Sequence, residues 1–467
     1  MPELTRADLL ARLPPEPDVT GLTAELRDAA SRRKLVVLDD DPTGTQTVHG
    51  VDVLTTWTEA DLTAAVLGSE PLFYVLTNSR ALTETAAADL AKTLSETLAR
   101  VQEVTGRPLD ILSRSDSTLR GHYPAELSPL TDFARPNGHL IVPAFPEGGR
   151  VTVDGVHYVL AGDTYRPVTD TDFARDPTFG YRHAYLPAWV EEKTGGAWRQ
   201  EEVLHVSIQT VRVGGPDAVA AVLMQAEHNR PVVADAVTYA DLSVLAAGLA
   251  RAERAGKRFL ARTAASFVRV RGGLAEKPLL TRTDLRLNAG RGGMVLVGSY
   301  VDLSARQLTA ARELEGVDAR ELSVQTLLEH GDPEAEAAAL ARWADSVMAT
   351  GRTALIYTSR SLVTEQGGKT HVEIAALVSA ALSSVPRHLP QIPAWIVDKG
   401  GINSSDVDTR GLGVRKARVL GQVKPGIPTW RLGAESRFPG MPYLVFPGNV
   451  GTDETLADII TLLGGEG

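Results

Sequence analysis

Residues 34–47 read KLVVLDDDPTGTQT, a short apolar segment followed by three consecutive carboxylates. The segment 35–38 is rich in branched apolar side chains, which predicts a buried β-strand. Pro42 ends the strand because it cannot donate a ladder hydrogen bond, and Gly44 permits a tight turn. The like charges of Asp39–Asp41 repel one another unless a cation, a ligand or hydrogen-bond donors offset them. Ligands bind at the carboxyl ends of strands in open α/β sheets, so we expect a site here.

Two other interpretations fit the same stretch. The acids can simply form a turn in which Asp41 or Thr43 caps the next element. Alternatively, an Asp-x-Asp-x-Thr pattern beginning at Asp39 is used by haloacid-dehalogenase-like phosphatases, in which the first Asp is the nucleophile. Those enzymes also need a late acidic pair near strand ends, whereas Asp235 and Asp398 are single acids. The phosphatase interpretation is therefore the weaker of the alternatives.

The length, charge and composition of the chain exclude several classes of function. A chain of 467 residues is long enough for two domains. A net charge of −10 argues against a general nucleic-acid binder, which would carry a basic stripe. The absence of cysteine excludes disulfides, thiolate metal sites and a cysteine nucleophile. No run approaches 18 apolar residues and no signal-peptide pattern begins the chain, so we expect a cytoplasmic protein with no membrane partner.

Predicted strands and helices alternate along both halves of the chain, which is typical of largely parallel sheets covered by helices. In the first half we expect strands at 51–54, 72–76, 109–112, 140–142 and 231–234. In the second half we expect them at 294–297, 353–357, 395–397 and 443–446. The Gly- and Arg-rich residues 271–293 between the halves form the predicted linker. The expected fold is α/β, with one domain over 1–270, a second over 294–467 and an active-site cleft between them.

In the first half, polar clusters follow several of the predicted strands. The loop after 109–112 contains Arg114, Asp116, Ser117, Thr118 and Arg120. A guanidinium group can hold a carboxylate through two parallel hydrogen bonds, and Asp116 with the hydroxyl groups could bind sugar hydroxyls. Arg80 and the segment 143–150 add similar groups at neighbouring strand ends. His122 and His157 could act as bases, but no HxH or HExxH spacing suggests zinc.

In the second half, glycine-bearing loops follow three predicted strands. They contain Gly298 with Ser299, then Gly400 with Gly401, then Gly448 with Asn449. Glycines let backbone N–H groups approach phosphate oxygens, and a helix N-terminus adds a favourable dipole. Each loop alone could be a plain turn. Together they predict a nucleotide cradle without a Walker motif.

These segments, taken together, resemble the four-carbon acid sugar kinase family. In the first half the matching motifs are DDPTG at 40–44, DSTLRG at 116–121 and PAFPEGGRVTVDG at 143–155. In the second half they are Gly298-Ser299, KGGINSS at 399–405 and FPGNVG at 446–451. The motifs occur in the family's order over nearly the whole chain. The departures are the extra acid Asp39, Asn403, Tyr300 and the less familiar stretch 160–230.

The resemblance implies ATP-dependent phosphorylation of a hydroxyl group on a small sugar acid such as a threonate, an erythronate or an oxo-tetronate. It implies an acid-sugar-binding domain at 1–270, a nucleotide-binding domain at 294–467, and ATP with Mg²⁺ as cofactors. Asp40 and Asp41 would be catalytic, one of them as general base. The substrate-binding residues would be Arg80, Arg114, Asp116, Ser117 and Arg120. The nucleotide-binding residues would be Gly298, Ser299, Lys399, Gly400, Gly401, Ile402, Asn403, Ser404, Gly448 and Asn449.

The sequence leaves several functional properties of the protein open. A non-catalytic sugar-acid sensor would keep the loops of the first half without needing the glycine loops of the second. The sequence does not distinguish which acid is used, which hydroxyl reacts, which Asp is the base or which residues hold the metal. It also leaves the oligomeric state open, a homo-oligomer included.

Overall fold

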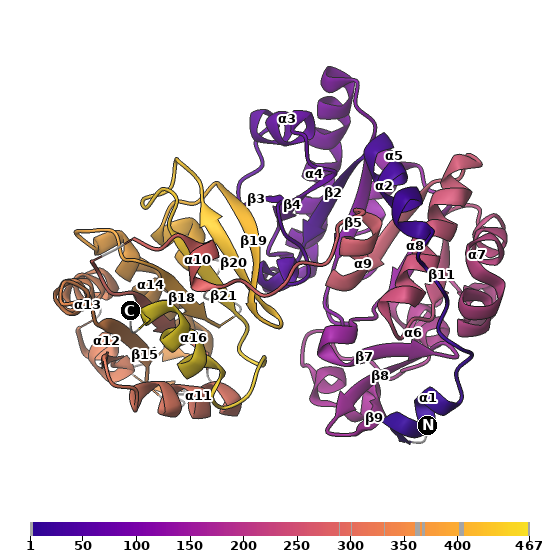
Figure 1. The fold of residues 1–467 in the computed structure, drawn as a ribbon. Coiled ribbons are helices and arrows are strands. Elements are labelled where there is room, and N and C mark those ends of the chain that lie inside the picture. The colour runs from indigo at the N-terminus through magenta and orange to yellow at the C-terminus, as the bar shows by residue number, and fades with distance from the viewer. Residues whose placement is uncertain are drawn as a thin grey trace. The chain divides into compact units, whose positions relative to one another are not determined.

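A computed structural model of the protein describes residues 3–288, 290–299, 301–330, 332–359, 365–366, 369–400 and 406–465. The chain folds into two compact units (Figure 1). Unit 1 comprises Met1–Val48 and Trp57–Glu276, and unit 2 comprises His49–Thr56 and Lys277–Gly467. The short excursion His49–Thr56 into unit 2 lies inside the range 1–270 that the sequence assigned to the first domain.

Unit 1 is built on a parallel sheet. Its strand order is β10 (Leu204–Val206), β11 (Arg230–Ala234), β6 (Gly138–Val142), β12 (Phe259–Thr263), β5 (Leu109–Arg114), β2 (Lys34–Asp39) and β4 (Leu72–Leu76). All six residues of β2 are buried. Because successive side chains point to opposite faces, both faces of the sheet are covered at this strand.

The helices of unit 1 form two groups that pack among themselves. One group contains α2 (Leu22–Arg32), α7 (Gly215–Leu223), α8 (Tyr239–Arg254) and α9 (Ala265–Arg271), and the other α3 (Glu59–Leu67), α4 (Glu84–Thr105) and α5 (Thr131–Ala134). The longest of them, α4, begins at Thr83, whose hydroxyl oxygen accepts a hydrogen bond from Ala86 N–H. It ends at Gly106, whose φ of 62° is left-handed and therefore favours glycine. Local capping thus defines both ends of the helix.

A smaller antiparallel sheet also belongs to unit 1. It contains β1 (Leu4–Thr5), β9 (Thr164–Pro167), β8 (Val156–Ala161) and β7 (Arg150–Val153) in that order. The sequence beyond 150 loses the regular alternation, and this sheet is the reason. The chain then forms α6 (Leu186–Lys193) before it returns to the main sheet at β10. A further short helix, α1 (Arg6–Ala11), lies near the N-terminus.

Unit 2 has a mixed sheet. Its strand order is β3 (Asp52–Leu54), β19 (Lys416–Lys424), β20 (Ile427–Leu432), β21 (Pro442–Phe446), β18 (Ile396–Lys399), β13 (Met294–Val297), β15 (Thr353–Thr358) and β14 (Val317–Leu322). The strands from β21 to β14 are parallel, and β3, β19 and β20 are antiparallel to their neighbours. The expected fold of two α/β domains with largely parallel sheets is confirmed.

Apolar side chains from both sheet and helices form the core of unit 2. Val295, Val397 and Phe446 of the sheet cluster with residues of α11 (Asp302–Arg312) and α16 (Thr455–Gly464). The described part of this unit also contains α10 (Arg282–Leu285), α12 (Val324–His330), α13 (Pro333–Met348) and α14 (His371–His388). Because α11 and α16 share this cluster, they pack on the same face of the sheet. This arrangement fixes the loops that precede the two helices.

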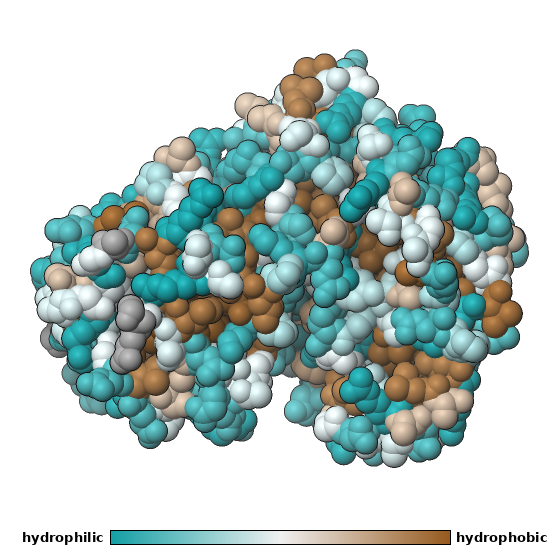
Figure 2. Space-filling model, viewed as in Figure 1, coloured by the Kyte–Doolittle hydropathy of each residue, from teal (hydrophilic) through white to brown (hydrophobic). Residues whose placement is uncertain are grey.

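Hydrophilic residues cover most of the face shown in Figure 2, and apolar residues form smaller groups among them. Large exposed apolar side chains include Leu10, Leu67 and Val104, which lie on different helices of unit 1. Single exposed apolar residues of this kind are normal at protein surfaces. None of the helices that the structure describes has the length and apolar character needed to cross a membrane.

Candidate active site

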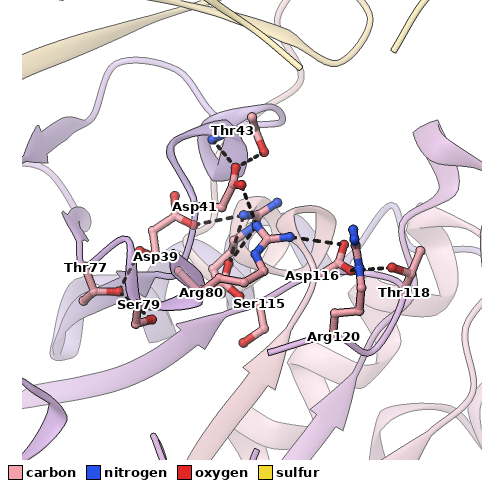
Figure 3. Close-up of polar contacts among 12 residues, drawn as sticks. Asp39, Asp41, Thr43, Thr77, Ser79, Arg80, Ser115, Asp116, Thr118 and Arg120 are labelled. Carbon is pink, nitrogen blue, oxygen red and sulfur yellow. Dashed lines mark hydrogen bonds and ion pairs between the residues drawn. The ribbon is translucent and has the colours of Figure 1, made fainter. Parts of the chain in front are cut away.

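The carboxyl ends of β4, β2, β5 and β12 lie next to one another in the sheet of unit 1. Asp39 pairs in register with both Leu76 and Arg114, and Arg114 pairs with Thr263. The loops that follow these strands therefore meet at one sheet edge. Figure 3 shows acidic and basic side chains at the ends of β2, β4 and β5, among them Asp41, Arg80 and Asp116, pointing toward one another. The structure thus brings together all the catalytic and substrate-binding residues that the sequence proposed for the first half.

Asp41 caps the turn that follows β2. Its carboxylate accepts hydrogen bonds from the backbone N–H of Thr43 at 2.8 Å and from the Thr43 hydroxyl group. It also pairs with Arg80 Nη2 at 2.7 Å. Burial raises the pKa of Asp41, but Arg80, Arg114 and the Thr43 hydrogen bonds outweigh it, so the pKa lies below its usual value. The capping interpretation of Asp41 is confirmed, and the same carboxylate also anchors Arg80.

Asp39 lies beneath this turn. The residue is only 1% exposed, and its Oδ1 accepts a hydrogen bond from Arg114 Nη1 at 3.1 Å. A Cβ atom on Gly44 would lie 2.0 Å from Asp39 Oδ2, so the turn can pass over the carboxyl group only because residue 44 has no side chain. Burial, with the charges of Asp40 and Asp41, raises the pKa of Asp39 to about 8, although Arg114 opposes the shift. A residue covered in this way is a poor candidate for the nucleophile that the phosphatase interpretation requires.

Asp40 has a different environment from its two neighbours. Its Oδ1 makes only long contacts, 3.4 Å to Arg80 Nη2 and 3.5 Å to Arg114 Nη1. Its Oδ2 is buried and has no hydrogen-bond partner among the described residues. Burial raises the pKa of Asp40 to about 6, and the two arginines offset only part of that rise. Asp40 therefore combines a carboxylate oxygen that accepts no hydrogen bond from the described residues with a pKa near neutrality. Both properties suit a proton acceptor.

Beside Asp40 there is a small cavity of about 20 Å³, large enough for one water molecule. Ser79, Ser113 and Glu126 contribute polar atoms to its lining, and the Ser79 hydroxyl group donates to Glu126. On another side of Asp40, a Cβ atom on Gly121 would lie 3.3 Å from Oδ2. Gly121 has a φ of 116°, a conformation that side chains rarely adopt. Glycine at this position lets the backbone approach the carboxylate.

Asp116 is the anionic centre of the loop after β5. It accepts hydrogen bonds from Arg120 Nε at 2.7 Å and from the Thr118 hydroxyl group, and Arg80 Nη1 lies 3.8 Å away. Although burial raises the pKa of Asp116, Arg120 and Arg80 lower it well below its usual range. Arg80 thus links Asp41 to Asp116. Ser117 contributes its backbone carbonyl oxygen, which accepts a hydrogen bond from His157 Nε2 at 2.7 Å.

His157 braces this loop. Its Nε2 must carry the proton, because it donates to a carbonyl group, while Nδ1 accepts from the Thr152 hydroxyl group at 2.9 Å. Burial lowers the pKa of His157 to about 4, so the ring is neutral at physiological pH. With both nitrogens engaged, the ring fixes the loop and is poorly placed to act as a base. His122 is also engaged, with Nε2 3.0 Å from the Leu82 carbonyl oxygen.

Residues of the stretch 160–230 also brace the loop that carries Asp116. The Tyr181 hydroxyl group donates to the Thr118 carbonyl oxygen at 2.6 Å. Asp176 lies 3.6 Å from Arg120 Nη1, and the Phe173 ring lies under the Arg120 guanidinium group with its centroid 5.0 Å away. This segment therefore holds the loop that carries Asp116 from outside.

Sequence reasoning did not single out two residues of this edge, Glu126 and Arg262, and it named Arg150 only as part of the segment 143–150 and its motif. Arg262 is the next-to-last residue of β12, a strand that the sequence did not predict. It is 3% exposed, and its Nη2 donates to the Arg120 carbonyl oxygen at 2.9 Å. The apolar run 259–261 between basic residues was the available signal for this strand. No sequence pattern distinguishes Glu126.

In unit 2, the loops after β13, β18 and β21 meet. The backbone N–H groups of Gly298 and Ser299 donate to the Lys399 carbonyl oxygen at 3.1 and 3.3 Å. A Cβ atom on Gly448 would lie 2.6 Å from Ser299 Oγ, and one on Gly400 would lie 3.2 Å from Ser299 N. The glycines therefore permit an approach that side chains would block.

Helix α11 fixes this group of loops. Ser304 Oγ donates to the Gly448 carbonyl oxygen at 2.9 Å, and Gln307 Nε2 donates to the Thr452 carbonyl oxygen at 2.7 Å. The Lys399 side chain is buried with its ammonium group 3.7 Å from the centre of the Phe446 ring, and Asn449 is exposed. The remaining nucleotide-binding residues that the sequence proposed, Gly401, Ile402, Asn403 and Ser404, lie outside the described residues, as does Tyr300.

Comparison with known proteins gives a consistent assignment. A family model described as a sugar-binding N-terminal domain matches residues 35–271, slightly more than half of the chain. A second, described as a nucleotide-binding C-terminal domain, matches residues 294–456. A relative from Cupriavidus necator named D-threonate kinase is 29% identical over 71% of this chain and 74% of its own length. The chain belongs to the four-carbon acid sugar kinase family.

Two further relatives agree with this assignment. A D-threonate kinase from Salmonella typhimurium is 25% identical over 91% of this chain and 97% of its own length. A D-erythronate kinase from Heliobacterium modesticaldum is 32% identical over 42% of this chain and 41% of its own length.

Two crystal structures share the fold. A protein from Salmonella typhimurium LT2 superposes with a TM-score of 0.69 and 19% identity, covering 91% of this chain and 98% of that one. Protein HI1011 from Haemophilus influenzae superposes with a TM-score of 0.63 and 18% identity, covering 92% of this chain and all of that one.

The contact between Gly44 and Asp39 gives a testable prediction. In Gly44→Ala the new methyl group collides with a buried carboxyl group that Arg114 holds in place. We expect a loss of about 1–3 kcal/mol in the free energy of unfolding, together with a loss of catalytic activity. Gly21→Ala is the matched control, because a Cβ atom there would have no neighbour within 4 Å. Chemical denaturation of both variants measures the effect, and equal stability of the two would contradict the packing described.

Proposed function

We propose that this protein transfers the γ-phosphoryl group of ATP to a hydroxyl group of a four-carbon sugar acid. The observation that carries the proposal is that Asp40 Oδ2 is buried without a hydrogen-bond partner in the described part of the chain, while the pKa of Asp40 lies near neutrality. The two family models support a sugar-binding half and a nucleotide-binding half in one chain. The relatives named threonate and erythronate kinases support the substrate class.

In the proposed reaction Asp40 Oδ2 accepts the proton of the substrate hydroxyl group. The hydroxyl oxygen then attacks the γ-phosphorus atom of ATP, and ADP leaves. Asp41 remains charged, since its pKa is lowered, and it holds Arg80 at 2.7 Å. Asp41 thus positions the cationic side of the site, while Asp40 takes up the proton. This division of roles follows from their different hydrogen-bond partners.

The neighbouring loop supplies the groups that orient the acceptor. Asp116 is an anion that can accept hydrogen bonds from sugar hydroxyl groups, with Arg80, Arg120 and Ser117 around it. Arg114 has a more internal role, because it pairs with Asp39 at 3.1 Å. We therefore assign Arg114 to balancing the buried acids. Fixed groups of this kind lower the entropic part of the barrier.

We assign nucleotide binding to unit 2. The residues proposed for it are Gly298, Ser299, Lys399, Gly400, Gly448 and Asn449, with Gly401, Ile402, Asn403 and Ser404 of the adjoining segment. Helix α11 begins just after the first of these loops, and a helix N-terminus favours phosphate. Mg²⁺ is proposed as the ion that accompanies ATP, where it would neutralise phosphate charge. It is usually held by phosphate oxygens, water and one or two carboxylates.

A panel of four-carbon acids tests the proposed function. We expect ADP release in the presence of ATP and Mg²⁺ to rise above the background hydrolysis rate with at least one threonate, erythronate or oxo-tetronate isomer. Release of phosphate from a phosphorylated sugar acid without ATP would instead support a phosphatase. Binding of an acid without any turnover would support a sensor. Either of these results would overturn the assignment.

Replacement of the proposed base tests the role of Asp40. Because Asp40→Asn keeps the shape but cannot accept the proton, turnover should fall by about 10²- to 10⁴-fold while ATP binding persists. Asp41→Asn should also abolish turnover, because it releases Arg80. Asp28→Asn, which removes an exposed carboxylate on α2, is the matched control. Loss of ATP binding in both site variants would place these acids on the nucleotide side.

The pKa of Asp40 predicts a pH dependence. The raised pKa of about 6 means that Asp40 is deprotonated and active above pH 6, and protonated and inactive below it. We expect kcat/KM for the sugar acid to fall about tenfold per pH unit below this value. ATP affinity, measured at the same pH values, separates this effect from titration of the nucleotide. A flat profile down to pH 5 would rule out Asp40 as the titrating base.

A further inference from the structure

Most of the arginines at the carboxyl edge of the unit 1 sheet are already paired with protein carboxylates. Arg80 lies 2.7 Å from Asp41, Arg114 lies 3.1 Å from Asp39, and Arg120 lies 2.7 Å from Asp116. A sugar acid brings one more carboxylate into this site. A guanidinium group with no acidic partner is the best candidate to receive it.

Arg150 is such a guanidinium group. Within the part of the chain that the structure describes, no carboxylate lies within 4 Å of it. Its Nη1 donates to the Gly148 carbonyl oxygen at 2.5 Å, but its Nε is buried without any hydrogen-bond partner among those residues. Burial lowers the pKa of Arg150, and nearby Asp116 only partly opposes this. A largely enclosed cation with no acidic partner among those residues is unfavourable unless a ligand compensates it.

The guanidinium group of Arg150 is held in a fixed position. A Cβ atom on Gly148 would lie 2.0 Å from Arg150 Nη1, so the group occupies the space that a side chain would fill. The Phe145 ring centroid lies 6.0 Å from it. The residue begins β7, next to the turn Pro146–Gly148. Two residues further along β7, Thr152 bonds to His157, whose Nε2 donates to the Ser117 carbonyl oxygen, so the strand that Arg150 begins lies against the loop that carries Asp116.

Arg262 also has no carboxylate within 4 Å among the described residues, but its surroundings differ. It is 3% exposed and lies over the rings of Tyr123 and Trp189, with centroids 5.7 and 5.4 Å away. Its Nη2 is bonded to the Arg120 carbonyl oxygen. These contacts give Arg262 a supporting role beneath the loop. Arg150, in contrast, retains partial exposure to solvent.

We propose that Arg150 binds the carboxylate of the sugar acid and thereby selects acids over neutral sugars of the same length. The inference rests on the proposed function and adds to it the residue that recognises the acid group. Arg150 would present its Nη2 edge to the carboxylate, because Nε is enclosed by protein atoms and Nη1 already donates to the Gly148 carbonyl oxygen. The hydroxyl groups of the substrate then extend from this anchor toward Asp116 and Asp40.

The test compares a four-carbon acid with its carboxamide, which is uncharged but of similar shape. In the unmodified protein the acid should bind more tightly than the amide. Arg150→Gln should raise KM for the acid by about 10- to 100-fold and abolish this preference, because charge-assisted hydrogen bonds are lost. Arg150→Lys, which keeps the charge but not the fork, should give an intermediate loss. The activity with the amide should fall far less than the activity with the acid.

Two further variants make the test specific. Gly148→Ala should displace the guanidinium group and reproduce part of the loss without altering Arg150 itself. Arg166→Gln is the matched control, because Arg166 lies in the same cross-strand row as Arg150 and pairs with Glu3 at 3.0 Å. It should leave both substrates unaffected.

The outcomes separate this inference from the proposed function. An unchanged KM for the acid in Arg150→Gln, or an equal loss for acid and amide in a folded variant, would overturn the role of Arg150. If the unmodified protein turns over no acid, the kinase assignment fails. Calorimetric binding of the acid and the amide to the full chain then still tests Arg150, because only acid binding should depend on it.

Discussion

The active-site edge of unit 1 depends on charge balance in a buried place. Asp39, Asp40 and Asp41 follow one another at the end of a strand covered on both faces, where three ionised carboxylates would repel strongly. Arg80 and Arg114 reach them from the two neighbouring strands of the parallel sheet. The sheet order is therefore also an electrostatic requirement, because it brings each guanidinium group to its acid.

The same balance gives the three acids separate roles. Asp41 has hydrogen-bond donors and an arginine, so it stays charged and holds the turn. Asp39 is covered by the turn and shares Arg114, which makes it part of the support. Among the residues that the structure describes, Asp40 has only long contacts at one carboxylate oxygen and no hydrogen-bond partner at the other. In the proposed reaction the proton acceptor is therefore the acid that has the fewest close hydrogen-bond donors among the described residues.

The sequence predicted part of the fold and part of the site. The strand before the acids, the alternation of elements and the motif order are local patterns, and they predicted the α/β fold and the family. The sequence also proposed Arg80 and Asp116 as neighbours of the acids, because strand ends meet at one edge of a parallel sheet.

The structural features that the sequence did not predict depend on contacts between residues far apart in the chain. Nothing local indicates that Gly44 covers Asp39, that His157 holds the Ser117 carbonyl oxygen, or that Arg114 balances an internal acid. The excursion His49–Thr56 pairs with β19, more than 350 residues later, and a pairing at this separation leaves no trace in composition. Strand β12 is short and follows a helix closely, so its apolar run was too brief to recognise.

The brace that Tyr181 and Asp176 form around the Asp116 loop has a consequence for protein engineering. The loop geometry is set partly by residues some 60 positions further along the chain, through the hydrogen bond from Tyr181 to Thr118 and the pair between Asp176 and Arg120. The loop and its brace therefore form one transferable module. A graft of residues 116–121 alone into a related scaffold would carry the side chains without their placement, whereas a graft that includes 172–181 would carry both.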